Sequence, residues 1–270
     1  MWNLIRAEWL KIRRCQILLV GIVSLALCPV MQYGTQLIMA AEYREPNYDF
    51  AHLFANVIWG NSQIFLPISL VMIGGWFVDR ESTHDTLKNV LTVPVPMSKL
   101  LAAKLAVTGL LSLALGVYSV CLILLTGIVF GLPGLTPALA FGCGVQVIAA
   151  AFTTYLVCTP MILIFGQIRG AYLGGSIVTF FFGYSILFFK RGVLLSAYPF
   201  SAALILAKFD MAQYNGATSP PSYPLAMAGV AAMLLASVLL LAISNRQREL
   251  KTPQVKKGKK NRRGARRKYG

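Results

Sequence analysis

The chain has 270 residues, of which 57% are hydrophobic and only 13% are charged, and its mean hydropathy is +0.66. A solvated surface needs about a quarter charged residues, so this composition excludes a soluble globular protein. The net charge of +16 is not a nucleic-acid signature. Twelve of the 25 Lys and Arg follow Asn245, and most of the others flank apolar runs, as they do in membrane proteins.

Residues 1–15 are predicted to form an amphipathic helix that lies in the membrane interface. Met1, Ile5, Trp9 and Ile12 fall on one helical face, and cationic side chains lie opposite. Tryptophan favours the depth of the lipid headgroups. The alternative interpretation is that this segment is only the cytoplasmic end of the first membrane helix.

The apolar runs predict an all-α integral membrane protein with six transmembrane helices, because about 18–20 apolar residues are needed to cross the hydrocarbon. An apolar run over residues 193–207 is short for a span and is interrupted by Pro199, which favours re-entrant or interfacial short helices. Three regions follow: an interfacial helix (1–15), a transmembrane domain (16–244) and a basic tail (245–270), which is expected to be disordered. The spans other than the second are expected at about 16–38, 100–130, 138–165, 171–189 and 225–244. An amphipathic turn or two from Phe50 is expected to lead into the second span, which would end near Val78.

The distribution of basic residues predicts that both termini are cytoplasmic. With six spans, 21 of the 25 Lys and Arg fall on the side of the termini. The other side holds four, which are Arg44, Lys190, Arg191 and Lys208. A seventh span at 193–207 would move the basic tail outside, against the positive-inside rule.

The sequence lacks the groups that would supply energy or chemistry. It has no GxxxxGK[ST] loop for phosphates and no HExxH motif. Its two histidines, His52 and His84, pair with no second metal ligand, so we expect no metal and no cofactor bound by this chain. The spans carry almost no ionisable residue at mid-depth of the kind that ion-coupled carriers need. Lys104 lies near a helix end, from which its ammonium is expected to reach the interface.

One cytoplasmic segment, residues 79–104, is polar without being a simple linker. Arg80 to Leu91 is predicted to form a short amphipathic helix between the second and third spans. Pro94 and Pro96 would end it, because proline lacks a backbone donor and restricts the residue before it, and Ser98 would cap the next helix. The alternative is an ordinary amphipathic loop at the headgroups.

This segment resembles the loop after the second membrane helix in permeases of the type-2 ATP-binding-cassette (ABC-2) exporters. Asp85 stands where that pattern usually has glycine. The basic N-terminal AEWLKIRR run, the six spans and the broken apolar stretch before the last span also resemble the family. The residues that match the loop pattern are Glu81, Thr86, Leu87, Lys88, Leu91, Pro94, Val95, Ser98, Lys99 and Lys104.

The resemblance implies a permease subunit of the bacterial plasma membrane that dimerises and docks separate ABC ATPase subunits, which would bind ATP and Mg²⁺. It is similar to permeases of bacitracin resistance and lantibiotic immunity, which implies export of amphipathic antimicrobial peptides or lipids. By the same resemblance, two segments would contact the ATPase. The coupling helix would present Arg80, Glu81, Thr83, His84, Thr86, Leu87, Lys88 and Leu91. The N-terminal helix would present Trp2, Ile5, Glu8, Trp9 and Ile12.

Two other classes stay open at this point. In a non-catalytic membrane scaffold or assembly factor, the same loop would only bind a cytoplasmic partner. A membrane enzyme would show a reaction in the purified chain alone. The basic run at 256–268 is expected to anchor the topology or to bind anionic lipid headgroups, and no nucleic-acid partner is expected.

Overall fold

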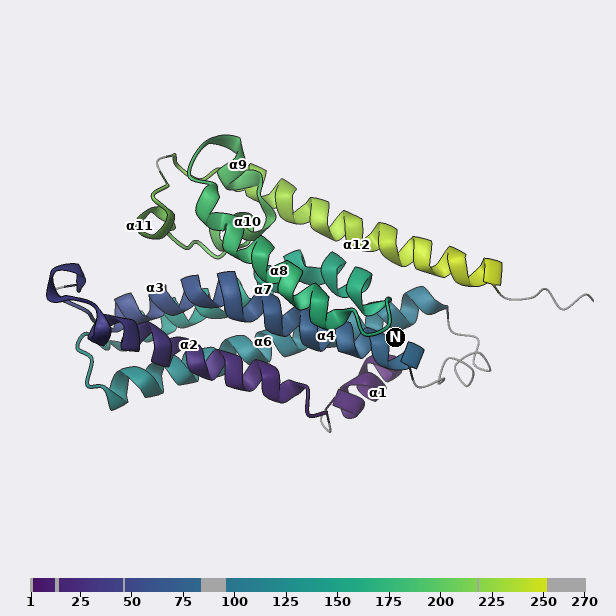
Figure 1. Ribbon diagram of the computed structural model, residues 1–270, viewed down its shortest axis with the longest axis horizontal. Coiled ribbons are helices and arrows are strands. Elements are labelled where there is room, and N and C mark those ends of the chain that lie inside the picture. The colour runs from purple at the N-terminus through teal and green to yellow at the C-terminus, as the bar shows by residue number, and fades with distance from the viewer. Residues whose placement is uncertain (1, 13–14, 46, 84–95, 218, 252–270) are drawn as a thin grey trace, which may run out of the picture.

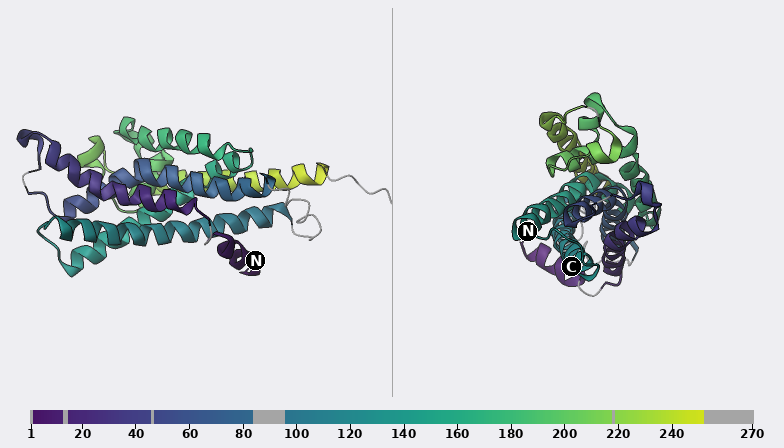
Figure 2. Two further views of the ribbon diagram at one scale, coloured as in Figure 1. Left: turned by 60° about the horizontal axis from the view of Figure 1, so that its bottom comes forward. Right: turned by 90° about the vertical axis from the view of Figure 1, so that its left-hand side faces the viewer.

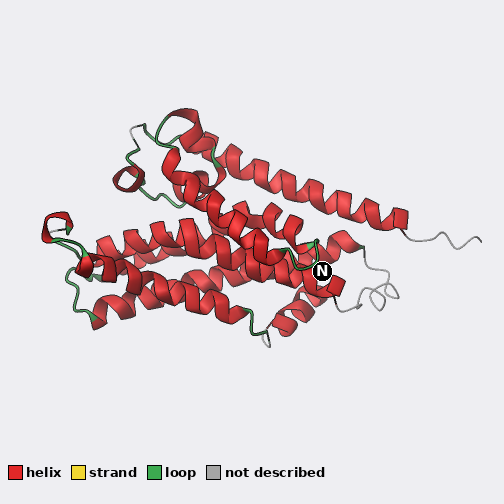
Figure 3. Ribbon diagram, in the orientation of Figure 1, coloured by secondary structure: helices red, strands yellow, loops and turns green. Residues whose placement is uncertain are grey.

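A computed structural model describes residues 2–12, 15–45, 47–83, 96–217 and 219–251 of the chain. All regular elements in these residues are helices, and Figure 3 shows them as one elongated bundle. The α-helices are α1 (Trp2–Ile12), α2 (Leu18–Ile38), α3 (Phe50–Gly60), α4 (Leu66–Thr83), α6 (Met97–Val129), α7 (Pro137–Gly166), α8 (Tyr172–Tyr184), α9 (Gly192–Ala197), α10 (Pro199–Leu206), α11 (Ala212–Asn215) and α12 (Tyr223–Lys251). Short non-α turns lie at η1 (Ala41–Tyr43), η2 (Asn61–Phe65) and η3 (Ser185–Phe188).

The prediction of an all-α membrane protein is confirmed. Among the described residues, five helical segments are long and apolar enough to cross a membrane. The sixth predicted span corresponds to the shorter apolar segment Tyr172–Phe188, formed by α8 and η3. The five are Leu18–Ile38, Phe50–Arg80, Met97–Val129, Pro137–Gly166 and Tyr223–Ser244.

The second span is the central helix of the bundle. In its most apolar stretch, 78% is buried inside the protein. It runs through α3, η2 and α4, and η2 is one turn of π-helix in which the Leu66 amide donates to the Asn61 carbonyl. Pro67 explains the wider turn, because proline has no N–H and its ring clashes with the carbonyl four residues earlier, which belongs to Gln63. A π-bulge relieves such a clash within a continuous helix.

Two helices extend beyond their predicted ends. The second span was expected to end near Val78, but α4 continues to Thr83, where the guanidinium of Arg80 lies 5.3 Å from the ring centre of Trp76 one turn earlier. The last span was expected to end at Ser244, but α12 continues to Lys251. Its extra residues are mostly good helix formers such as Gln, Arg, Glu and Leu.

The two ends of the bundle carry different elements. The helix α1, the end of α4, the start of α6 and the end of α12 lie at one end, which we call the α1 end (Figure 1). The turn η1 and the helices α9 and α11 lie at the opposite end, and both views in Figure 2 keep the long helices roughly parallel. The two termini of the described chain therefore share one end, as six crossings require.

The predicted pair of short helices before the last span is present. Pro199 starts α10 directly after α9, where Tyr198 has an extended backbone. The helix α10 packs against α7 and α12, and its residues from Phe200 to Ile205 are buried.

Candidate functional site at the α1 end

The helix α1 packs one face against α6. Along that face Ile12 and Glu8 are buried, while Ile5 and Trp9 are half-buried and contact the core. Trp2 lies away from this face and is 74% exposed. The buried face therefore includes a carboxylate among apolar side chains, and the fold must compensate its charge.

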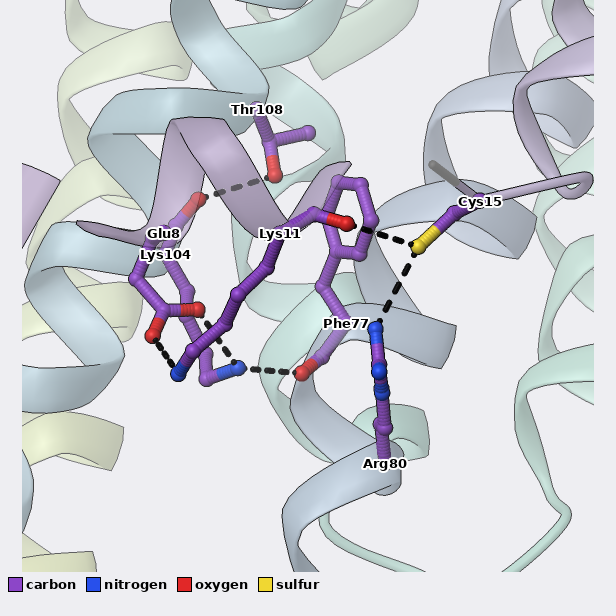
Figure 4. A network of polar contacts seen from close by, with 7 residues as sticks. All are labelled: Glu8, Lys11, Cys15, Phe77, Arg80, Lys104 and Thr108. Atoms are coloured by element: carbon purple, nitrogen blue, oxygen red, sulfur yellow. Dashed lines mark hydrogen bonds and ion pairs between the residues drawn. The ribbon is translucent and has the colours of Figure 1, made fainter. Parts of the chain in front are cut away.

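Lys104 of α6 supplies that compensation and joins three helices (Figure 4). Its ammonium lies 3.2 Å from the Glu8 carboxylate and donates to the Phe77 carbonyl of α4 at 2.5 Å. Lys11 contacts the other oxygen of the same carboxylate at 2.5 Å. The hydroxyl of Thr108 donates to the backbone carbonyl of Lys104 at 2.9 Å. We call Glu8, Lys11, Phe77 and Lys104 the three-helix joint.

The expectation that Lys104 reaches the interface was wrong. The Lys104 side chain is only 5% exposed, and the Glu8 side chain is only 6% exposed. A lysine on a lone span would extend toward the headgroups. Here α1 covers that route, and the Glu8 carboxylate and the Phe77 carbonyl hold the ammonium inside the protein.

The electrostatics of the three-helix joint favour an ionised Glu8. Burial by itself would raise the pKa of this carboxyl, because it disfavours the charged form. The charges of Lys104 and Lys11 and their hydrogen bonds outweigh burial, so the pKa of Glu8 lies below its usual value. The ion pair therefore stays formed at neutral pH.

A second set of contacts ties the end of α4 to its surroundings. The Arg80 guanidinium donates to the thiol of Cys15, and that thiol donates to the Lys11 carbonyl at 3.0 Å. The Asp79 carboxylate accepts a hydrogen bond from the amide of Gly170, in the turn between α7 and α8, at 3.3 Å. The last turns of α4 are thus linked to α1 and to the α7–α8 turn.

The residues predicted for the coupling helix fall partly inside the described chain. Arg80 lies in α4 beside Trp76, and Glu81 and Thr83 belong to the last turn of α4. The remaining predicted residues lie outside the described residues: His84, Thr86, Leu87, Lys88 and Leu91. Their role, and the independent helix predicted for Arg80 to Leu91, stay predictions.

The middle of the second span holds a separate polar cluster that sequence reasoning did not identify. The Asn61 amide in η2 donates to the hydroxyl of Ser119 in α6 at 3.0 Å. The Asn61 side-chain oxygen, the Ser62 hydroxyl and the Gln63 side-chain nitrogen are buried and have no hydrogen-bond partner among the described residues. A cavity of about 10 Å³ adjoins Asn61, Ser62 and Ser119, which is about the size of one water molecule. In the described chain, no three His, Cys, Asp or Glu side chains are grouped as a metal site.

These features define a polytopic, all-helical membrane protein whose N-terminal helix is joined to two spans by a buried ion pair. The family model described as ABC-2 family transporter protein matches residues 4–186. The chain therefore belongs to the ABC-2 transporter family and is a membrane permease component of an ABC transporter. The comparison with curated proteins gives no match. The matched region includes α1 from residue 4 onward and the three-helix joint, and it ends before α9.

Proposed function

We propose that this chain is the permease subunit of an ATP-driven exporter, with both termini in the cytoplasm of a bacterial cell and ATP hydrolysed by separate ABC ATPase subunits. One observation carries the proposal beyond the family assignment. Lys104 binds Glu8 of α1 and the Phe77 carbonyl of α4 at the same time. Lys104 itself belongs to α6, so a single ammonium connects all three helices.

The position of the three-helix joint explains how such a permease could receive force. Residues 84–95 connect α4 to α6 at the α1 end. A push on this connection would act on both spans, and the ion pair would transfer it to α1. The three helices would then move as one body. Alternating access requires an element of this kind with two arrangements of similar free energy, whose balance ATP changes.

The predicted contacts with the ATPase fit this arrangement. Glu81 and Thr83 lie in the last turn of α4, next to the joint. On α1, Trp2 is exposed while Glu8 and Ile12 face the bundle. Of the predicted α1 contacts, we therefore propose Trp2 for the ATPase, whereas Glu8 belongs to the joint and Ile12 packs in the hydrophobic core.

The proposed substrate is an amphipathic molecule, such as an antimicrobial peptide or a lipid, and the proposed assembly contains two permease subunits. Two peripheral spans support this proposal. In the most apolar stretch of α2 only 22% is buried within the chain, and in that of α12 only 17% is buried. Their apolar surfaces are thus available to lipid, to a second permease or to a substrate that enters from the membrane.

The coupling can be tested in the complex of this chain with its ATPase, reconstituted in lipid nanodiscs. Glu81→Ala should make ATP hydrolysis independent of the permease and abolish export or resistance, with the amount of folded chain unchanged. The matched control is Glu42→Ala, which removes an exposed carboxylate from η1 at the opposite end of the bundle. Export that persists in Glu81→Ala would rule out the coupling assignment. If no ABC ATPase co-purifies with the chain, the result would favour the alternative class, a non-catalytic membrane scaffold.

A further inference from the structure

A pocket of about 440 Å³ lies at the end of the bundle opposite α1. Its lining residues come from α9, the end of α10, the short helix α11 and the start of α12. Figure 1 shows where these helices lie in the bundle. The walls are largely apolar and include Phe209, Met211, Pro220 and Pro221. Its volume falls in the range of small-molecule sites, roughly 300–1,000 Å³. The pocket lies beyond the residues that match the family model.

Lys208 lines this pocket in an unusual backbone conformation. Its φ is +57°, in the left-handed region that favours glycine. The turn ends α10, since the Lys208 amide donates to the Ile205 carbonyl at 2.9 Å and the Phe209 amide donates to the Leu204 carbonyl at 3.0 Å. Glycine is the common residue at such a position. A lysine there is strained, which suggests that its side chain is needed for something other than the turn.

The Lys208 ammonium has no carboxylate partner in the part of the chain that the structure describes. Asp210 also lines the pocket, but its carboxylate accepts a hydrogen bond from the Ala212 amide at 2.9 Å and so caps the start of α11. The backbone of Lys208 is fixed by Gln146, whose side-chain amide donates to its carbonyl at 2.7 Å. The backbone of Lys208 is therefore fixed at the pocket, its side chain is exposed, and its ammonium has no counter-ion among the described residues.

The segment between α8 and α12, which forms much of the pocket, has a net positive charge. The predicted topology puts few basic residues on this side of the membrane. Three of the four basic residues predicted for that side, Lys190, Arg191 and Lys208, lie between α8 and α12. Asp210 is the one acidic residue in the sequence of this segment. The amide of Gly192, next to Arg191, contacts the hydroxyl of Ser219 in the pocket wall at 3.4 Å.

We propose that this pocket binds the headgroup of an anionic phospholipid from the adjacent leaflet, which is the outer leaflet in the proposed orientation. The Lys208 ammonium would contact the phosphate, and the apolar walls would contact the glycerol and the first methylenes. Two observations favour a lipid over a free anion. The walls are apolar, and Tyr223, which also lines the pocket, begins a transmembrane helix, where tyrosine typically marks headgroup depth. This binding does not depend on transport or on an ATPase.

The test uses the purified full-length chain in detergent, without ATPase, titrated with short-chain phosphatidylglycerol and followed by native mass spectrometry. We expect a saturable complex, and weaker binding of phosphatidylcholine with the same acyl chains. Lys208→Gly should weaken phosphatidylglycerol binding about fivefold, the contribution of one basic residue near a lipid surface. This variant should fold at least as well as the parent, because glycine suits the left-handed turn. Lys208→Arg should keep the affinity.

The control is Lys190→Ala, which removes a cation that does not line the pocket and should change the affinity less than twofold. Equal affinity of the parent and Lys208→Gly for phosphatidylglycerol would overturn the proposal. Equal binding of phosphatidylcholine would do so as well. If inorganic phosphate displaces the lipid at similar concentrations, the pocket is a site for free anions and the lipid assignment is wrong.

Discussion

Gly183 of α8 lies directly against the carbonyl of Gln63 in the π-turn. A Cβ atom placed on Gly183 would be 2.3 Å from that carbonyl oxygen and 3.1 Å from the ring of Pro67. Proline at position 67 cannot donate a hydrogen bond to the Gln63 carbonyl. The close approach of α8 at Gly183 covers this carbonyl, so the proline, the π-turn and the glycine form one packing arrangement.

We expect Gly183→Ala to destabilise the bundle by separating α8 from the second span, since the clash is with backbone rather than with a flexible side chain. Gly174→Ala is the matched control on the same helix, because a Cβ there would meet nothing within 4 Å. It should be neutral or stabilising by up to about 1 kcal/mol. Thermal unfolding in detergent should therefore separate the two variants. Equal melting temperatures would show that α8 does not pack at the π-turn.

The three-helix joint predicts that replacing Glu8 and replacing Lys104 lower the stability by different amounts, and that the two losses do not add. Glu8→Leu removes the Glu8 carboxylate from the buried Lys104 ammonium and should cost about 3 kcal/mol, typical of a broken buried pair. Lys104→Met should cost less, because the Glu8 carboxylate keeps Lys11. The double variant should recover much of the loss, since no buried charge then lacks its partner. Melting temperatures of the four proteins measure this coupling, and strictly additive losses would contradict the ion pair.

Stability should also fall in acid because of Glu8. The pKa of this carboxyl is lowered in the folded chain, so the folded state favours its ionised form. The stabilisation that ionised Glu8 provides is complete above pH 4.5, the usual pKa of a glutamate, and is lost as the pH falls toward the lowered pKa. The difference in melting temperature between the parent and Glu8→Gln should therefore shrink below about pH 4.5. A difference that stays constant with pH would show that Glu8 is not ionised.

At the opposite end, Asp49 caps the second span. Its carboxylate accepts a hydrogen bond from the His52 amide at 3.0 Å and lies 2.7 Å from the His52 ring nitrogen. Burial would raise the pKa of Asp49, but the hydrogen bonds and charge of His52 lower it. Asp49→Ala should cost about 1 kcal/mol, the typical loss of an N-cap. Asp49→Asn should retain most of the stability, because asparagine also caps well, and chemical unfolding in mixed micelles should rank the three proteins.

The sequence allowed the helical architecture to be predicted because the lengths of apolar runs decide which segments can span a membrane. The first and fourth spans, for example, begin and end within two residues of their predicted limits. The π-turn was missed, although Pro67 gave a signal for it. Hydrophobicity does not distinguish a π-turn from an α-turn. The clash between proline and the carbonyl of Gln63 would have located it.

The three-helix joint could not be predicted from one sequence. From the sequence, Glu8 was expected to contact the ATPase, and Lys104 was expected to lie near the end of the third span. Each residue alone can reach water, which is the default expectation for a charged side chain near a helix end. Only the packing of α1 on α6 shows that they meet. The pocket at Lys208 was likewise hidden, because a left-handed lysine has no sequence signature.

The pairing of Glu8 with Lys104 also sets an order of biogenesis, since the two residues are 96 positions apart. Ribosomes add about 5–20 residues each second, so α1 is made roughly 5–20 seconds before its lysine exists. The first helix to be synthesised therefore cannot dock until α6 has been made. During that interval Glu8 has Lys11 but not Lys104 as a partner, and α1 can dock on α6 only after the third span has been made.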